Sequence, residues 1–180
     1  MNRCKWVNLK NEIYVDYHDN EWGKEEHDDR MLFELLILEG FQARLSWECV
    51  LNKREYFRKA FDNFDYIKIS KYDSKKINEL LNNQNIIRNK LKVNAAITNA
   101  KVFIDIQKEF GSFDKYIWSF TDYKVIKNMD DNLKTTSHLS DEISKDLKKR
   151  GMKYVGSTII YSYLQAIGII DDHELNCDFY

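Results

Sequence analysis

An almost wholly apolar run, residues 31–38, leads directly into the segment EGFQARLSW, residues 39–47. The run has the composition of a hydrophobic helix, and an acid, Glu39, stands at its end. Gly40 follows as a natural helix breaker. We therefore expect a helix at about residues 30–39, begun by a capping aspartate (Asp28 or Asp29), and a second helix capped by Ser46.

The connection between these two helices is unusually apolar. Helix–helix connections are ordinarily polar, whereas this one carries Phe41, Leu45 and Trp47. A carboxylate at a buried edge beside aromatic rings is suited to a flat, electron-poor ligand. The alternative is that Glu39 is solvated at a helix end and that Trp47 belongs to the core.

The composition indicates one globular domain, residues 1–180, with 43% hydrophobic and 14% aromatic residues. There is no run of 18 apolar residues and no signal-peptide core at the N-terminus, so we expect a cytoplasmic protein with no membrane segment. Three cysteines are an odd number, which argues against a disulfide framework.

The net charge of −1 does not by itself indicate a nucleic-acid-binding protein. The basic residues nevertheless gather in three runs, at 53–59, 86–103 and 145–153. Each run alone is consistent with an ordinary solvated helix face. Their distribution leaves binding to DNA open.

The periodicity predicts an all-α fold. Beyond the first two helices we expect a short one starting at Asp73 or Ser74, one at 90–109, a short one at 113–120, one capped by Ser140 and ended by Gly151, and one at 157–167. The last stretch has strand propensity at 158–161, but no credible partner strand exists. Residues 1–24 look irregular but packed, and 122–139 look like a loop.

Residues 75–105 suggest a helix-hairpin-helix element. An amide-rich break separates two helices, and basic residues follow it directly. In such elements backbone N–H groups hold a DNA phosphate. The glycines usual at positive-φ positions are missing, so Asn85 and Asn89 would have to serve there. Asn85, Arg88 and Lys90 are the candidate DNA contacts.

Two pairs of metal-binding residue types lie at opposite ends of the chain: Cys4 with His18, and His173 with Cys177. Two cysteines and two histidines suit a tetrahedral Zn²⁺ with no open position, hence one structural zinc per chain. Such a site would tie residues 1–24 to residues 168–180. The alternative is two unrelated His–Cys pairs.

Motifs along the whole chain resemble the bacterial DNA-3-methyladenine glycosylase I family of the helix-hairpin-helix superfamily. They are RC-x-W from Arg3, YHDNEWG from Tyr17, LFE from Leu32, LEG from Leu38, QA-x-LSW from Gln42, IIR from Ile86, WSF from Trp118, SK-x-LKKRG from Ser144, VG-x-T from Val155, DH from Asp172, and Cys177. The combination of YHDNEWG with LEG and LSW is specific.

The resemblance implies an all-helical glycosylase that removes N3-methyladenine from double-stranded alkylated DNA and acts as a monomer. It implies a structural zinc held by Cys4, His18, His173 and Cys177. The family's base pocket maps onto Glu39, surrounded by Tyr14, Tyr17, Trp22, Trp47 and, nearby, Trp6. Because the methylated base is cationic and leaves easily, recognition by Glu39 and the aromatic faces would do most of the work.

Arg44 and Leu45 are candidates for a wedge that fills the gap left by an extruded base. The family more often has a small residue where Arg44 stands. Asp105, at the spacing of a catalytic aspartate in related glycosylases, is better interpreted as a surface helix residue. The chain has no obvious lysine nucleophile near the pocket, so we expect no strand-cleaving lyase step.

Two other functions are compatible with these patterns. A non-catalytic module could bind damaged DNA through the same hairpin and carry the same structural zinc, although a binder need not enclose a base. A zinc hydrolase would need an open ligand position, and four protein ligands leave none.

Overall fold

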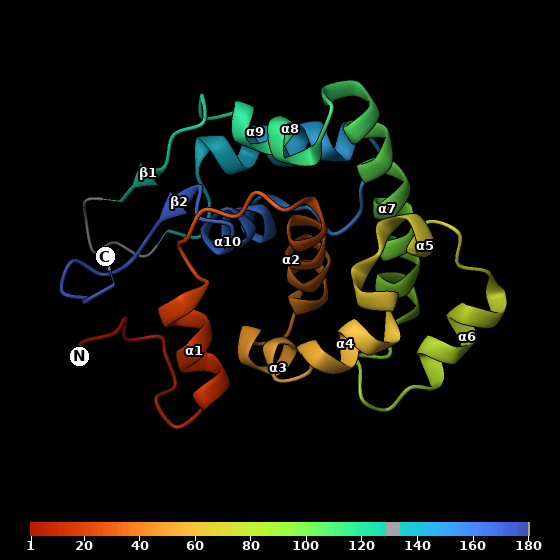
Figure 1. Cartoon of the computed structure of the whole chain (residues 1–180), viewed down its shortest axis with the longest axis horizontal. Coiled ribbons are helices and arrows are strands. Elements are labelled where there is room, and N and C mark those ends of the chain that lie inside the picture. Colours follow the sequence, from red (N-terminus) through yellow and green to blue (C-terminus); the bar gives the residue numbers. More distant parts are fainter. Residues whose placement is uncertain (129–133, 180) are drawn as a thin grey trace.

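We describe a computed structural model of the chain, in which residues 1–128 and 134–179 are placed. The described residues form ten α-helices, which pack around a core of aromatic and aliphatic side chains. Figure 1 shows how these helices are arranged. They are α1 (Glu12–Asn20), α2 (Asp29–Gln42), α3 (Trp47–Leu51), α4 (Arg54–Ala60), α5 (Tyr66–Ile69), α6 (Ser74–Asn82), α7 (Lys90–Phe110), α8 (Phe113–Ser119), α9 (His138–Lys149) and α10 (Ser157–Ala166), with a 3-10 turn at Asp62–Phe64. No helix in the described part of the chain has the length and apolarity needed to cross a membrane.

Helix α2 is the centre of this arrangement and packs against α3, α7, α8 and α10. The carboxylate of Asp28 caps it by accepting a hydrogen bond from the Met31 N–H at 2.9 Å. Every residue from 32 to 41 is buried, because neighbours cover the helix on all sides. The apolar run at 31–38 therefore became a helix as predicted.

The expected break at Gly40 is wrong, because α2 continues through it to Gln42. The glycine serves close packing instead. A Cβ atom at this position would lie 3.4 Å from the Cβ of Tyr154, at the near limit of ordinary contact. One extra turn of helix thus places Glu39 inside α2 rather than at its end.

The prediction that residues 1–24 are irregular is wrong for α1. Asn11 caps this helix, and Tyr14, Tyr17 and His18 share one face through their i, i+3, i+4 spacing. The face is aromatic rather than aliphatic, so it did not look like a helix stripe. Its stability comes from tertiary packing, which holds Tyr17 and His18 buried.

The expected cap of α9 is also shifted by one turn. Ser137 is the cap, and Ser140 is the third residue of a capping box, in which each serine hydroxyl accepts a hydrogen bond from the other's backbone N–H. The helices expected from residue 74, at 90–109, at 113–120 and at 157–167 are confirmed within two residues, including the ambiguous stretch that forms α10. The single helix expected after Ser46, with Trp47, Phe57 and Phe61 on one face, is wrong, because a turn at residues 52–53 divides it into α3 and α4.

The all-α prediction needs one small addition. Strands β1 (Ile126–Lys127) and β2 (Ile170–Asp171) form a two-residue parallel pair. The pair attaches the first part of the predicted loop 122–139 to the C-terminal segment. Residues 129–133 of that loop lie outside the described residues.

Helices α6 and α7 pack against each other and are joined by residues 83–89. Asn89 caps α7, with a φ of −126°, and its side chain accepts hydrogen bonds from the N–H groups of Leu91 and Lys92. Residues 83–89 are all described, and none of them has a positive φ. The expectation that Asn85 and Asn89 replace glycines at positive φ is therefore wrong, since this connection turns without left-handed residues.

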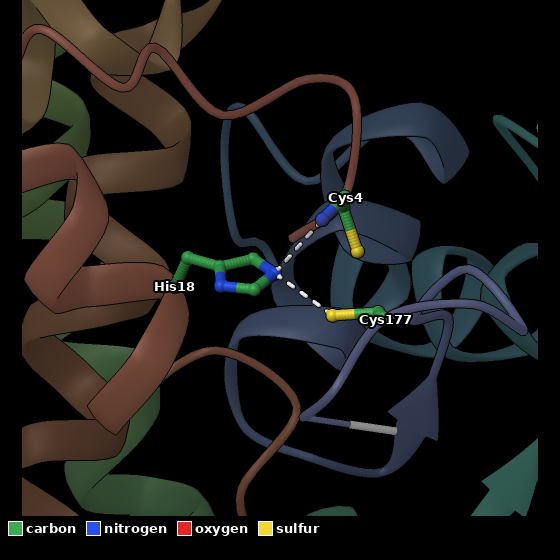
Figure 2. Close-up of side chains that lie close together, drawn as sticks. All are labelled: Cys4, His18 and Cys177. Carbon is green, nitrogen blue, oxygen red and sulfur yellow. Dashed lines mark hydrogen bonds between the residues drawn. The ribbon is translucent and has the colours of Figure 1, made fainter. Parts of the chain in front are cut away.

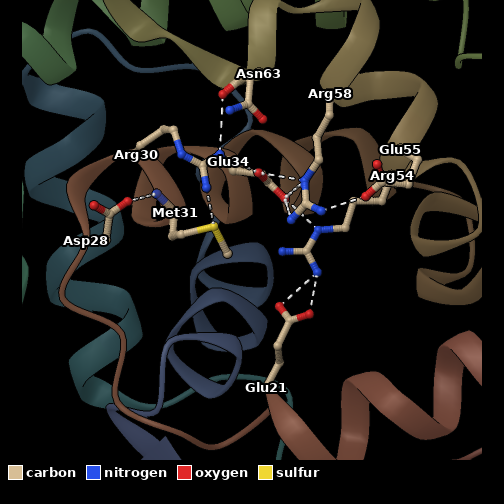
Figure 3. A network of polar contacts seen from close by, with 9 residues as sticks. All are labelled: Glu21, Asp28, Arg30, Met31, Glu34, Arg54, Glu55, Arg58 and Asn63. Atoms are coloured by element: carbon tan, nitrogen blue, oxygen red, sulfur yellow. Dashed lines mark hydrogen bonds and ion pairs between the residues drawn. The ribbon is translucent and has the colours of Figure 1, made fainter.

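A buried ionic network fixes α1 and α4 to α2 (Figure 3). Glu34 of α2 is fully buried and accepts hydrogen bonds from Arg54 Nε at 2.5 Å and Arg58 Nε at 3.0 Å. Burial raises the pKa of the Glu34 carboxyl, but the two guanidinium groups outweigh it and hold the pKa below its ordinary value. Arg54 also binds Glu21 at 2.7 Å, next to Trp22.

Replacing Arg54 with methionine should lower the free energy of unfolding by about 3 kcal/mol, because it leaves part of the Glu34 charge buried without its partner. Arg58→Met is the matched control. Arg58 binds the same carboxylate, but its side chain is 28% exposed, whereas the side chain of Arg54 is 7% exposed. Urea denaturation should give a loss for Arg58→Met of no more than about 1 kcal/mol. Equal losses in the two variants would show that burial of Arg54 is not the decisive factor.

Candidate functional site

A cavity of about 240 Å³ opens between α1, the last turn of α2, the start of α3 and α10. Its size lies just below the usual range for ligand pockets, about 300–1,000 Å³, as suits a single-ring or two-ring ligand. The lining side chains are Trp6, Tyr14, Tyr17, Trp22, Glu39, Gln42, Trp47, Lys134, Ser162 and Gln165. All six residues that were predicted for the base pocket are among them.

Glu39 is the only acid in this described lining. It is 3% exposed, and its Oε2 atom has no hydrogen-bond partner among the described residues. Burial raises the pKa of this carboxyl to about 8. A buried carboxyl without a partner is costly to the fold, so its presence in a cavity points to a ligand that supplies the missing contact.

The aromatic side chains form the walls. Trp6 lies edge-to-face against Tyr14 and Trp22, with ring centroids 5.3 and 4.9 Å apart. Tyr17 and Trp47 lie 5.4 Å apart on the other side. The indole Nε1 of Trp47 is buried and unpaired among the described residues. The cavity thus offers one acceptor and one donor that the protein itself does not satisfy.

Four lining residues were missed from the sequence: Gln42, Lys134, Ser162 and Gln165. Gln42 follows Glu39 by three positions, so the helical continuation through Gly40 brings it to the same face. Ser162 and Gln165 come from α10, which no local pattern connects with residues 39–47. No obvious lysine nucleophile was expected near the pocket. Lys134 nevertheless belongs to the lining, and its Nζ donates to Asn128 Oδ1 at 2.8 Å.

A turn with unusual backbone geometry follows the pocket. Arg44 is exposed and has a φ of +69°, a left-handed conformation that non-glycine residues rarely adopt. Leu45, 43% exposed, stands beside it at the tip. The two residues line a second cavity of about 160 Å³, which shares Glu39, Gln42 and Ser162 with the first. The second cavity therefore adjoins the predicted base pocket.

The same turn borders a groove of about 500 Å³ on its other side. Arg88 and Asn89 of the hairpin and Tyr154 line this groove together with Arg44 and Leu45. The structure thus brings three of the five residues predicted to contact DNA, Arg44, Leu45 and Arg88, to one groove. Of the other two, Lys90 is exposed on the first turn of α7, and Asn85 is exposed further along the connection. Asp105 lies on the surface of α7, bonded to Lys108 at 2.9 Å, and lines none of these cavities.

Replacing Arg44 with glycine should stabilise the fold by about 1 kcal/mol, because glycine adopts a positive φ without steric cost. The midpoint of urea denaturation should rise accordingly. Arg44→Ala is the control that removes the same guanidinium and keeps the backbone strain, so it should not raise the midpoint. A lower midpoint for Arg44→Gly would mean that the arginine side chain contributes more than its backbone conformation costs.

Three of the predicted metal ligands meet beside the pocket (Figure 2). The Sγ atoms of Cys4 and Cys177 and a ring nitrogen of His18 lie within 4.8 Å of one another, and all three residues are buried. The ring of His173 packs edge-to-face on that of His18, with centroids 5.2 Å apart, and its buried Nε2 has no partner among the described residues.

Both histidines are oriented in the same way. His18 Nδ1 bonds Asp19 Oδ1, and His173 Nδ1 bonds Asp171 Oδ1, each at 2.8 Å. These bonds leave Nε2 of each ring without a carboxylate partner, the arrangement by which carboxylates orient metal-bound histidines. His18 Nε2 lies 3.5 Å from Cys177 Sγ, whereas His173 lies outside the group of three ligand atoms within 4.8 Å of one another. The donor set therefore fits the Zn²⁺ expected from the sequence.

The methyladenine glycosylase family model matches residues 6–180. The chain belongs to this family. It is 43% identical to the DNA-3-methyladenine glycosylase of Haemophilus influenzae, over 97% of this chain and 96% of that protein. It is 40% identical to DNA-3-methyladenine glycosylase 1 of Escherichia coli, over 100% and 97% of the two chains.

The fold is that of solved members of the family. 3-Methyladenine DNA glycosylase I from Staphylococcus aureus, studied for its recognition of 3-methyladenine, superposes with a TM-score of 0.94. The two sequences are 33% identical, and the match covers 99% of this chain and 96% of that one. The mostly helical fold expected from the resemblance is thereby confirmed.

Proposed function

We propose that this methyladenine glycosylase releases N3-methyladenine from alkylated double-stranded DNA by hydrolysing its N-glycosidic bond. The observation that carries the proposal is the unpartnered carboxyl of Glu39 in an aromatic cavity of base size. The names of the relatives give the substrate class, and the cavity supplies the matching chemistry.

The charge of the damaged base provides the basis for recognition. Methylation at N3 makes the purine cationic, and aromatic faces favour a cation by about 0.5–2 kcal/mol per good contact. The Glu39 carboxylate accepts a hydrogen bond from the exocyclic amino group and attracts the positive ring. An unmodified adenine lacks the charge that compensates a buried carboxylate, so it is disfavoured in the same cavity.

The reaction itself needs little further assistance. Water attacks C1′ of the deoxyribose, the C1′–N9 bond breaks, and its electron pair neutralises the cationic base. One proton of the water stays on the new C1′ hydroxyl group, and the other goes to solvent. Glu39, by stabilising the charge of the base in the extruded state, makes extrusion of this base more favourable than extrusion of a normal one.

The turn at Arg44 and Leu45 is the proposed wedge into the duplex. Leu45 is exposed and apolar, and the turn lies between the base pocket and the groove lined by Arg88. In this proposal Leu45 fills the stack, while Arg44, Arg88, Lys90 and the backbone near Asn85 hold phosphates. One chain carries all of these elements, so the enzyme acts as a monomer.

We further propose one structural zinc ion, held by Cys4, His18, His173 and Cys177. When bound, the ion joins the two terminal segments and supplies no reacting group. It also supports the pocket, because Trp22 lies between the two sites. Its ring centroid is 4.6 Å from that of His173 and 4.9 Å from that of Trp6.

Base release from a methylated duplex tests the proposed function. Chromatography of the products should show free 3-methyladenine, and the DNA strand should stay intact until alkali is added. Borohydride, which traps a lysine–sugar adduct, should not link the protein to DNA, despite Lys134 in the pocket lining. Binding of methylated duplex without base release would instead support a non-catalytic module that recognises damaged DNA.

A further inference from the structure

Lys92 is an unusual buried cation outside the pocket. It belongs to the first turn of α7, directly after the hairpin, and is only 7% exposed. Its Nζ donates hydrogen bonds to two backbone carbonyl oxygens, that of Phe41 at 2.8 Å and that of Ala43 at 2.7 Å. Lys92 therefore joins the start of α7 to one segment, the end of α2, which lies 49–51 residues earlier in the chain.

These two carbonyl groups belong to the end of the central helix. The last turn of α2, residues 39–42, is fully described and contains no basic residue. The last carbonyl groups of an α-helix have no N–H partner four residues on, and a cation placed there also interacts favourably with the helix dipole. Lys92 supplies both contributions from another helix. Burial lowers the pKa of the Lys92 ammonium, and the nearby Arg44 charge has a smaller effect in the same direction. The two hydrogen bonds to Phe41 and Ala43 compensate the ammonium group for this burial.

The position of Lys92 connects two surfaces. On one side are Arg88 and Lys90, which belong to the hairpin and its helix. On the other side is the turn at Arg44 and Leu45, which starts at the carbonyl of Ala43. Lys92 lies between them in the lining of the 500 Å³ groove. Glu39 stands two residues before Phe41, on the same helix end.

We propose that Lys92 is a positioning residue that couples DNA binding at the hairpin to the turn that enters the duplex. The hairpin holds the backbone, and Lys92 fixes the distance from there to Leu45, so that Leu45 meets the stack at the damaged base. Lys92 touches neither base nor reacting atoms, and it acts at extrusion rather than at bond cleavage. The inference rests on the proposed glycosylase function.

Lys92→Met removes the hydrogen bonds and keeps the length of the side chain. Misplacing a positioning element by about 1 Å costs about 100-fold in rate. We expect kcat/KM on a methylated duplex to fall at least about tenfold further than on the same methylated oligonucleotide left single-stranded, where no base pair must open. Affinity for free 3-methyladenine, measured by quenching of tryptophan fluorescence, should stay within about twofold, because the pocket is retained.

Lys90→Met is the matched control, since it removes one positive charge from the same helical turn without a contact to α2. Lys90→Met should weaken duplex binding and make that binding less dependent on salt concentration. It should lower excision from both substrates by similar factors. Lys92→Arg, which keeps a cation with several donors, should restore part of the preference for the duplex. If Lys92→Met fails to fold, Lys92→Gln, which keeps an N–H donor, is compared in the same way.

Three results would overturn the proposal: equal losses on duplex and single strand, an unchanged duplex rate, or a parallel loss of affinity for free 3-methyladenine. The last would place Lys92 in support of the pocket rather than of the turn. Wild-type protein that releases no base from either substrate would instead contradict the proposed function, so the two failures are distinguishable.

Discussion

Replacing Glu39 with glutamine should lower excision of 3-methyladenine by about 100-fold or more, while the protein stays folded. Glutamine has nearly the same shape and still offers an oxygen atom, but it carries no charge to balance the cationic base. The measurement is single-turnover release of free base from a methylated duplex, with circular dichroism as the check of the fold. Wild-type rates in this variant would remove Glu39 from the mechanism.

The pH dependence identifies Glu39 independently of the size of that loss. In the free enzyme this carboxyl has a pKa of about 8, so at pH 7 most molecules must lose a proton before they can pair with the cationic base. We expect kcat/KM to rise about tenfold per pH unit up to about pH 8 and then to level off. This rising limb should be missing in Glu39→Gln.

The stability of the wild type and that of Glu39→Gln should depend differently on pH in the range where Glu39 titrates. The pKa of Glu39 is raised by folding, from 4.5 to about 8, so the folded protein holds this proton more tightly than the unfolded chain. Wild-type stability therefore decreases as pH rises from about 4.5 to about 8, and Glu39→Gln lacks this contribution. Above about pH 5 we expect the variant to be more stable than the wild type, which separates its loss of activity from unfolding.

Removing the proposed zinc should unfold the terminal region and abolish activity together. Structural zinc contributes roughly 10–16 kcal/mol of binding free energy in small domains. Here the ion would add to the contacts between the two terminal segments, among them the hydrogen bonds from Lys5 N–H to Glu174 Oε1 and from Asp178 N–H to Asn2 O. Because Trp22 packs on His173, loss of the ion also releases a wall of the base pocket. Chelator treatment followed by near-ultraviolet circular dichroism and the excision assay measures both effects.

Cysteine variants provide the matched comparison. Cys177→Ala removes a proposed ligand, whereas Cys49→Ala removes a half-buried free cysteine outside the cluster. Elemental analysis should give one zinc per chain for the wild type and for Cys49→Ala, and much less for Cys177→Ala. Activity lost with the fold intact would indicate a catalytic metal, and zinc-free active protein would contradict the site altogether.

The helices with aliphatic stripes and polar caps could be predicted from the sequence. Asp28 and Ser46 cap α2 and α3 as expected, and the apolar run before Glu39 fixed the central helix. The end of α2 could not be predicted, because Gly40 lies inside the helix, where it packs closely on Tyr154. Local propensity contains no information about such a neighbour.

The candidate site was predicted mostly through the resemblance to a family. Spacing alone left Glu39 and Trp47 open to an ordinary structural interpretation. Ser162 was missed because α10 reaches the pocket only in the folded chain. Lys92 looked like one member of a basic run, and its role in closing α2 depends on carbonyl groups about 50 residues away. Patterns of charge in a sequence do not distinguish a solvated lysine from a buried one.

The central claim is that the cavity between Glu39 and the tryptophans holds the damaged base. A crystal structure with free 3-methyladenine tests it most directly. We predict that the base lies between the aromatic walls, with a Glu39 carboxylate oxygen within about 3 Å of the exocyclic or a ring nitrogen. An empty cavity at saturating base, or a base bound elsewhere with Glu39 still unpartnered, would contradict the account.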